Sequence, residues 1–138
     1  MVEIHPPGLN AGGLGAALED LTAQAAGAGV TPTVHVSGME GTPDHVIALV
    51  WRVAREAIRN AVRHADATTV RVDVLGEGRQ VSLTVSDDGV GFDPTVDGRQ
   101  DSYGLRGLQS LVEDGGGRLQ VQSASGAGTT LRMVVERG

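Results

Sequence analysis

The sequence predicts a two-layer α+β sandwich, in which helices cover one face of a β-sheet. Three segments repeat apolar residues at helical spacing, and five shorter segments alternate apolar and polar residues as half-buried strands do. Four of these shorter segments form two pairs joined by short glycine-containing turns, which is typical of β-hairpins. Because helices alternate with strands along the chain, we expect the helices to pack as one layer on the sheet.

The three predicted helices differ in how clearly their ends are marked. Residues 14–29 form an amphipathic pattern that ends in glycine, a common helix terminator. Residues 42–66 begin with Thr42, a good N-cap, and Pro43, which is favoured at the first helical position. Residues 105–117 form a shorter pattern that also ends in glycine. The middle helix is the longest and carries the most continuous apolar stripe.

The predicted strands follow the helices in chain order. Residues 31–38 form a single strand candidate, and residues 70–74 and 81–85 form a hairpin with its turn at residues 76–78. Residues 118–135 form a second hairpin with "SGAG" as its turn. The stretch "GVGFDPTVDGRQDSYG" between the first hairpin and the last helix has no periodicity, so we expect a mobile loop there.

The composition excludes several classes of function. The chain has 138 residues, a net charge of −6 and one residue each of Trp, Tyr and Phe, which argues against a nucleic-acid or anionic membrane surface as its main partner. It has no cysteine, hence neither disulfides nor thiolate metal sites, as expected in a reducing compartment. All 11 basic residues are arginine, which excludes a lysine-dependent P-loop and leaves guanidinium groups as the phosphate-binding cations.

The first candidate site is a column of polar side chains on the long helix. Glu56, Asn60 and His64 are spaced four residues apart and therefore lie above one another, beside Arg63. The Asn60 carbonyl is a neutral oxygen that suits magnesium, and Glu56 is placed to act as a general base. A solvated helix face with a local Glu–Arg pair is the ordinary alternative.

The second candidate site is the segment "SDDGVGFD", which follows a strand directly. Asp87 would offer a fixed acceptor to an exocyclic amine such as that of adenine. Gly89 and Gly91 would let the backbone approach a ring closely and let the next loop move. A glycine-rich turn capped by aspartate is the ordinary alternative.

Two further glycine motifs complete the set. In "SYGLRGLQS", Gly104 and Gly107 flank the start of the last helix, where exposed amides, the helix dipole and Arg106 favour phosphate. In "SGAGTTL", the hydroxyl of Thr129 would complete an adenine pocket. An ordinary helix start and an ordinary hairpin turn are the respective alternatives.

Together, the four motifs resemble those of the GHKL, or Bergerat-fold, ATPase superfamily. "REAIRNAVRHA" resembles the N box, "DDGVGF" the first glycine box, "YGLRGL" the second, and "GAGTTL" the closing threonine motif. The superfamily contains histidine kinases, type II topoisomerases, mismatch-repair ATPases, a heat-shock chaperone and anti-sigma kinases. The resemblance spans roughly residues 43–135 and implies a mixed, mostly antiparallel sheet with helices on one face.

The N-terminal segment narrows the resemblance to sensor histidine kinases of the NarL/DesK-like class. "HPPGLNAGGLGAALEDL" resembles the linker and first helix that follow the dimerization helices in that class. By this resemblance, residues 1–13 are a linker from dimerization and phosphoacceptor helices missing at Met1. Residues 14–138 are the ATP-binding catalytic domain, with a lid at about 90–103 that we expect to be disordered or displaced without nucleotide.

The resemblance also assigns roles to residues. Asn60 would ligate Mg²⁺, Glu56 would help the acceptor histidine lose its proton, and Asp87 would bind the adenine amine. The residues implied to bind ATP are Asn60, Arg63, His64, Asp87, Gly89, Gly91, Gly104, Leu105, Gly107 and Thr129.

The sequence departs from the family pattern in three places. Ser102 stands where many relatives have the first glycine of the second box, and residues 109–111 replace a charged stretch. None of the four histidines is followed by an acid, as the acceptor histidine is in these kinases. The chain therefore resembles the catalytic part of a kinase and is expected not to phosphorylate itself.

The resemblance implies a protein-histidine kinase domain that moves the ATP γ-phosphoryl to a histidine on a dimerization helix, for relay to a response regulator. We expect it to be cytoplasmic and monomeric as this fragment, whether or not its parent is membrane-anchored. An anti-sigma factor with serine kinase activity and a nucleotide-binding pseudokinase are the alternatives. A self-contained ATPase is disfavoured because such relatives use a catalytic lysine and this chain has none.

Overall fold

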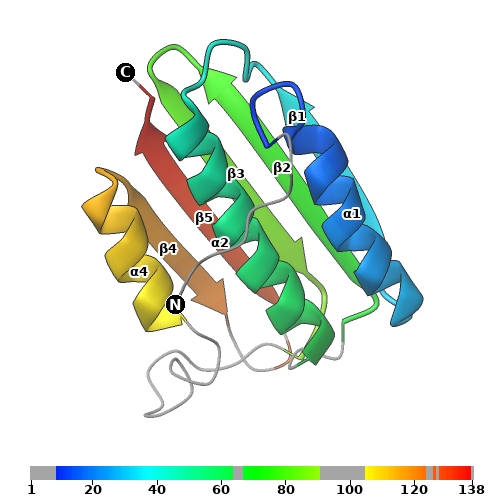
Figure 1. Cartoon of the computed structure of the whole chain (residues 1–138). Helices are drawn as coiled ribbons and strands as arrows, with labels where there is room; N and C mark the ends of the chain where they lie inside the picture. Colours follow the sequence, from blue (N-terminus) through cyan, green and yellow to red (C-terminus); the bar gives the residue numbers. More distant parts are fainter. Residues whose placement is uncertain (1–8, 64–66, 91–104, 124–125, 127, 138) are drawn as a thin grey trace.

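The computed structural model describes residues 9–63, 67–90, 105–123, 126 and 128–137. Within them the chain forms three helices and five strands, in the order α1, β1, α2, β2, β3, α4, β4, β5 (Figure 1). The helices are α1 (Leu14–Gly27), α2 (Asp44–Arg63) and α4 (Leu105–Asp114). The strands are β1 (Thr31–Ser37), β2 (Thr69–Glu77), β3 (Gln80–Asp87), β4 (Arg118–Ser123) and β5 (Thr129–Glu136).

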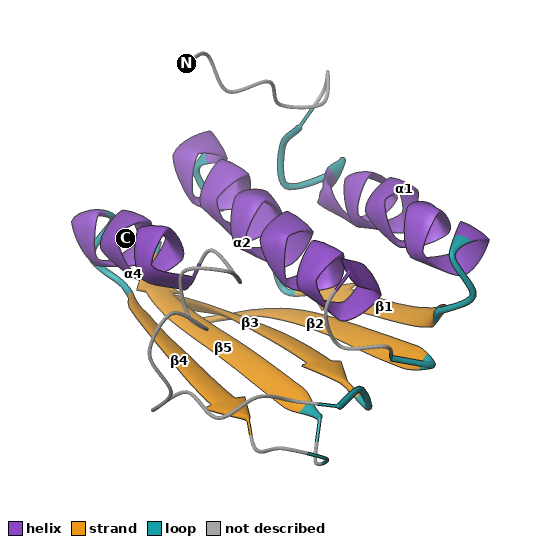
Figure 2. Cartoon of the chain, turned by 90° about the horizontal axis from the view of Figure 1, so that it is seen from below, coloured by secondary structure: helices purple, strands orange, loops and turns teal. Residues whose placement is uncertain are grey.

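The five strands form one mixed sheet in the order β1-β2-β3-β5-β4. The β1–β2 pair is parallel, and the other three pairs are antiparallel. All three helices lie on the same side of this sheet, so the described residues form two layers (Figure 2). The predicted α+β sandwich with helices on one face is confirmed.

One local prediction differs from the structure. The first hairpin turns at Gly78 and Arg79 rather than at residues 76–78, because Gly76 and Glu77 still pair with Val81 and Gln80. The single strand β1 runs parallel to β2, as the expected mixed sheet allows, because the α2 crossover carries the chain back to the same end of the sheet.

The core lies between the sheet and the helices. Along β2 the inward residues Val70, Val72 and Val74 are at most 2% exposed, while their neighbours face solvent. α2 places its apolar stripe on β2 and β3, and α1 and α4 cover β1 and β4. The stripe of α2 consists of Val46, Ile47, Val50, Trp51, Val53, Ala54, Ala57, Ile58 and Ala61. Each valine or leucine buried in this way contributes about 1.5–3 kcal/mol.

Candidate functional site

One end of the buried sheet face is polar. Val70, Asp87, Thr129 and Ser123 lie side by side in register across β2, β3, β5 and β4. Residues paired in this way point to the same face of a sheet, and Val70 is 1% exposed, so the row points toward the helices. The end of α2 and the start of α4 lie at this same end of the sheet (Figure 1). We call these four residues the polar row, because three of them, Asp87, Thr129 and Ser123, are polar.

Asp87 is a half-buried carboxylate in the middle of the polar row. Its Oδ1 accepts a hydrogen bond from the backbone N–H of Gly89 at 2.9 Å, and the carboxylate also accepts one from the backbone N–H of Thr129. Burial raises the pKa of Asp87 above its usual value, although these two amides act in the opposite direction. The sheet end therefore holds an oriented acceptor against an apolar surface.

The connection into β5 packs tightly against this carboxylate. A Cβ added at Gly128 would lie 2.3 Å from the backbone oxygen of Asp87, and Gly128 has φ +75°. The Thr129 hydroxyl lies 2.8 Å from the Ser123 hydroxyl, which donates to the Gly128 carbonyl at 3.1 Å. Only a residue without a side chain fits at position 128, so the strand end and the threonine motif can form one surface.

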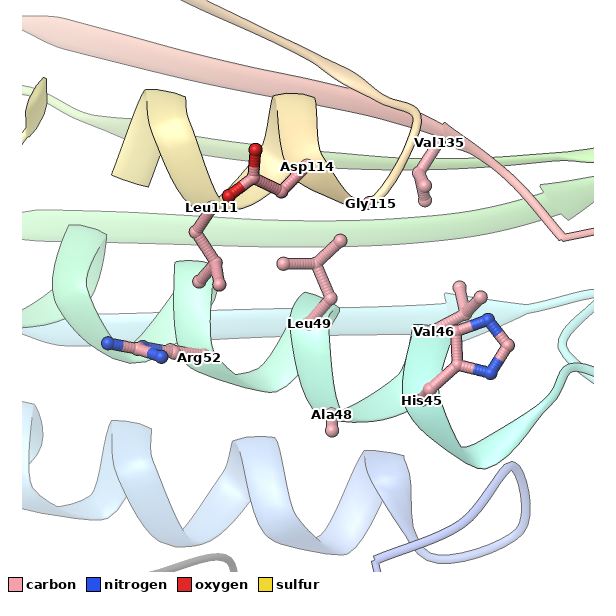
Figure 3. Close-up of a pocket in the computed structure, with 9 residues that line it drawn as sticks. All are labelled: His45, Val46, Ala48, Leu49, Arg52, Leu111, Asp114, Gly115 and Val135. Atoms are coloured by element: carbon pink, nitrogen blue, oxygen red, sulfur yellow. The ribbon is translucent and has the colours of Figure 1, made fainter. Parts of the chain in front are cut away.

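α2 carries the predicted polar column along the flank that faces α4. Leu49 and Leu111 point into a groove of about 300 Å³ between α2 and α4 (Figure 3). Glu56 and Asn60 are half-buried and lie two and three turns after Leu49 on the same stripe. Glu56 also forms an ion pair of 3.7 Å with Arg59, the local pair that the sequence allowed. The stripe leads from the groove toward the end of the sheet that holds the polar row.

Arg63 lies in the last turn of α2, beside the polar column. It is exposed and, together with Arg55 and Arg59, lines a groove of about 580 Å³ between α1 and α2. The Arg63 side chain thus borders the α1 groove at the end of the helix where Asn60 also lies.

The second glycine motif is only partly described. Leu105 is the first residue of α4, and Gly107 is an exposed position where an added Cβ would meet nothing within 4 Å. Gly107 therefore leaves open space in the first turn of this ten-residue helix, where an anion site at a helix N-terminus would lie. His64, Gly91, Gly104, the lid at about 90–103 beyond Val90, and the predicted state of that lid lie outside the described residues.

The donor set near Asn60 fits magnesium only in shared coordination. The described part of the chain holds no group of three or more His, Cys, Asp or Glu able to bind a metal by themselves. A single carboxamide oxygen suits Mg²⁺, which keeps several waters and takes its other ligands from substrate phosphates. The residues present therefore fit a metal that arrives with a phosphorylated ligand.

Two residues that matter to this geometry were missed in the sequence. Ser123 contacts the Thr129 hydroxyl, and its place follows from the register of the second hairpin, which the sequence pattern could have supplied. Asp88 binds the start of β2, a contact between residues about 20 positions apart that no local pattern reveals.

The fold and motifs agree with a known protein family. The family described as histidine kinase-, DNA gyrase B- and HSP90-like ATPase matches residues 45–138. The chain therefore belongs to this family of nucleotide-binding ATPases.

Within the family, the chain is similar to sensor histidine kinases. It is 34% identical over 139 residues to the sensor histidine kinase MctS of Rhizobium johnstonii. This alignment covers 98% of this chain and 30% of MctS. It is thus a histidine-kinase-type ATPase domain that spans less than a third of this relative. The anti-sigma alternative is not favoured by these relatives.

Solved structures support the same relationship. The blue-light activated histidine kinase of Erythrobacter litoralis EL346 superposes with a TM-score of 0.73 at 26% identity, covering 90% of this chain and 42% of that one. The histidine kinase AdeS of Acinetobacter baumannii has a TM-score of 0.70 at 15% identity, over 89% of this chain and 62% of that one, which supports the fold alone. Among the described residues, no helix combines the length and apolar character needed to cross a bilayer.

Proposed function

We propose that this domain binds ATP and donates its γ-phosphoryl group to a histidine on a dimerization helix of a parent kinase, for relay to a response regulator. The observation that carries the proposal is Asp87, a half-buried acceptor held by two backbone amides at the polar end of the core. Membership of the ATPase family and similarity to sensor histidine kinases support it.

The adenine end of the site would be built by the polar row. Asp87 accepts a hydrogen bond from the exocyclic amine, and the Thr129 hydroxyl, paired with Ser123, assists at the ring. Gly128 keeps the β5 connection close against the strand end. Gly89 donates its backbone N–H to Asp87, and its lack of a side chain would let the ring approach closely. Adenine is preferred because its amine matches the acceptor of Asp87.

The phosphate end would be built by α2 and the glycine boxes. Asn60 contributes its carboxamide oxygen to Mg²⁺, which neutralises phosphate charge when bound. Glu56, one turn earlier, accepts the proton of the acceptor histidine. The residues proposed to lie near the phosphates or to move the lid are Arg63, His64, Gly91, Gly104, Leu105 and Gly107.

The proposed organisation follows the motifs. Residues 1–13 are a linker from the dimerization helices, and residues 14–138 are the catalytic domain of a NarL/DesK-like kinase. We propose that the domain works in the cytoplasm, is monomeric as this fragment, and meets the dimerization helices as its direct partner.

Calorimetric titration with a non-hydrolysable ATP analogue, with and without Mg²⁺, tests the binding role. The chain is expected to bind, Asp87→Ala to abolish binding, and Asn60→Ala to remove only the magnesium-dependent part. Asp73→Ala is the matched control, because it removes a half-exposed carboxylate from β2 that pairs with Arg71, away from the candidate site. No binding by the parent chain under any condition would refute the proposal.

Phosphoryl transfer needs a second experiment. The isolated chain is expected to show negligible labelling with radioactive ATP, and a supplied dimerization-helix pair is expected to become labelled on histidine. Stable phosphate on the isolated chain would contradict the histidine-kinase role. Nucleotide binding without transfer to any helix pair would favour the pseudokinase alternative instead.

A further inference from the structure

Asp88, the neighbour of Asp87, binds the opposite side of the strand end. Asp88 follows the last residue of β3, and its side chain is exposed where that of Asp87 is half-buried. Its Oδ1 accepts hydrogen bonds from the backbone N–H groups of Thr68 and Thr69, each at 2.8 Å. Its Oδ2 accepts a hydrogen bond from the Thr68 hydroxyl. One carboxylate thus collects three donors.

These donors hold a junction between strands. Thr69 begins β2, and its carbonyl accepts a weaker bond of 3.4 Å from the Asp88 N–H. The carbonyl of Thr68 accepts a bond of 2.9 Å from the N–H of Thr31, the first residue of β1. Asp88 therefore links the end of β3 to the start of β2 and, through Thr68, to the start of β1.

The same junction lies between the two halves of the candidate site. Residues 64–66 connect the end of α2 to Ala67 and Thr68, so the position of Thr68 limits where α2 can end. Asn60 lies in the last turn of α2, and Asp87 lies immediately before Asp88. Holding Thr68 against Asp88 thus holds the proposed metal side of the site against the proposed adenine side.

An ordinary capping aspartate does not explain this arrangement. Such residues usually bond to backbone groups two or three positions away, whereas Asp88 bonds to groups 19 and 20 positions away. A carboxylate with three donors is also strongly stabilised in its charged form, and these bonds lower the pKa of Asp88 to about 2. The junction is therefore held by charge-assisted bonds across the physiological pH range.

We propose that Asp88 is a positioning residue for nucleotide binding, which fixes the connection after α2 to the strand end that carries Asp87. This inference rests on the proposed function. Asp88 does not touch the nucleotide. It lowers the cost of binding because the two sides of the site are already at the correct separation in the empty domain.

Nucleotide affinity in four variants of the full chain tests the proposal. Asp88→Ala removes all three bonds and is expected to weaken binding of the magnesium–ATP analogue about tenfold. Asp88→Asn keeps a carbonyl acceptor for the two amides and is expected to recover most of this loss. Thr68→Val removes one bond and is expected to weaken binding about two- to threefold. The double variant Asp88→Ala with Thr68→Val is expected to bind no more weakly than Asp88→Ala, because the two residues act through one contact.

Two controls separate positioning from stability. Val74→Ala, far from Asp88 on β2 and 2% exposed, lowers the melting temperature but is expected to leave the affinity unchanged at room temperature. Hydrogen exchange of the Thr68 and Thr69 amides should be faster in Asp88→Ala than in the parent chain, and the control Val74→Ala should not show this local change. If Asp88→Ala does not fold, Asp88→Asn and Thr68→Val carry the comparison.

The outcomes are distinct. Affinity of Asp88→Ala within twofold of the parent, or an equal loss in Val74→Ala, would overturn the positioning role while leaving the proposed function intact. Absence of binding by the parent chain would refute the proposed function, and this inference with it. Graded loss in the order Asp88→Ala, Thr68→Val, Val74→Ala supports the inference.

Discussion

Asp87 and Asp88 show how one step past the end of a strand suits the same side chain to two different roles. Asp87 points toward the helices, where burial raises its pKa. Asp88 points outward, where the Thr68 hydroxyl and the amides of Thr69 and Thr68 lower its pKa to about 2. The first is suited to recognise a ligand, and the second to hold the chain that surrounds the ligand.

The raised pKa of Asp87 predicts a conflict between stability and binding. A folded-state pKa above the usual 3.8 means that the folded state binds the proton more tightly than the unfolded state. The stability contribution of Asp87 therefore falls as pH rises from about 4 through the folded pKa. Asp87→Asn is expected to raise the melting temperature at neutral pH by about 1–3 °C. The same change should weaken ATP-analogue binding.

Thermal denaturation of parent and Asp87→Asn, each with and without the analogue, measures both effects. A lower melting temperature for the empty variant would show that the bonds from Gly89 and Thr129 outweigh the cost of burial.

The lowered pKa of Asp88 predicts the opposite dependence on pH. Its folded pKa of about 2 lies below the usual 3.8, so its contribution is fully present above pH about 4 and is lost as pH falls toward 2. The difference in unfolding free energy between the parent and Asp88→Asn should therefore shrink over this interval. Urea unfolding at several acidic pH values measures it. A difference that stays constant down to pH about 2 would show that the charge of Asp88 does not contribute.

At the scale of elements, the polar row depends on how the last hairpin enters β5. Gly128 has φ +75° and lies against the backbone of Asp87, so its position joins the closing motif to the first glycine box. Gly126, in the same connection, has φ +80° but open space around it, and its N–H donates to the Val90 carbonyl. The two glycines have similar backbone angles and differ in what a side chain would meet.

This difference makes a matched pair of substitutions. Gly126→Ala is expected to cost about 1 kcal/mol, because only the left-handed conformation is penalised. Gly128→Ala adds a clash with the Asp87 carbonyl and is expected to cost about 2–4 kcal/mol and to weaken nucleotide binding. Denaturant unfolding and analogue titration of both variants check the prediction. Equal costs would show that the β5 connection can move away from Asp87.

α2 shows why an element's sequence does not fix its functional side. Its polar residues surround about half of the helix, and α1 and α4 border this half on its two sides. Arg52 lines the groove beside α4, whereas Arg55, Arg59 and Arg63 line the groove beside α1. Helical periodicity placed Arg63 beside the polar column, but only the neighbouring helices show which groove its side chain borders.

At the scale of the whole molecule, the two ends of the sheet are built differently. One end carries the polar row, while the other end is held together by Arg137, just after β5. Arg137 donates from Nη1 to the Gly38 carbonyl at 2.6 Å and to the Thr42 hydroxyl at 3.0 Å, and from Nε to the Gly78 carbonyl at 2.9 Å. It thus joins the β1–α2 loop, the β2–β3 turn and the last strand.

Arg137→Ala is expected to destabilise the fold by about 1–3 kcal/mol, because it leaves these acceptors without their charged donor. Nucleotide affinity should be unchanged, since Arg137 and the polar row lie at opposite ends of the sheet (Figure 1). Arg137→Lys should recover little, because an ammonium group cannot reproduce the planar fork of donors. Urea unfolding and analogue titration check the prediction. A large loss of affinity in Arg137→Ala would contradict the separation of the two ends.

The sequence predicted most of the fold and named most of the candidate site. The elements follow from periodicity, which reports local geometry: the alternation in residues 70–74 and 81–85 predicted β2 and β3. The turn was predicted two residues early, because Gly76 looks like a turn residue but pairs with Val81. Its glycine is instead needed for the approach of Gly38, whose oxygen would lie 2.1 Å from an added Cβ. Such contacts between distant segments leave no local pattern.

The sequence by itself determined which residue types are available for the chemistry, namely an acid before Gly-x-Gly, an asparagine on the long helix and a threonine opening the last strand. It did so because these motifs are local. The tertiary structure decided that Asp87, Thr129 and Ser123 stand in one row, that the Arg63 side chain borders the groove between α1 and α2, and that Asp88 holds Thr68. Sheet register and helix packing join residues that are far apart in the chain, so only the folded molecule fixes their relative positions.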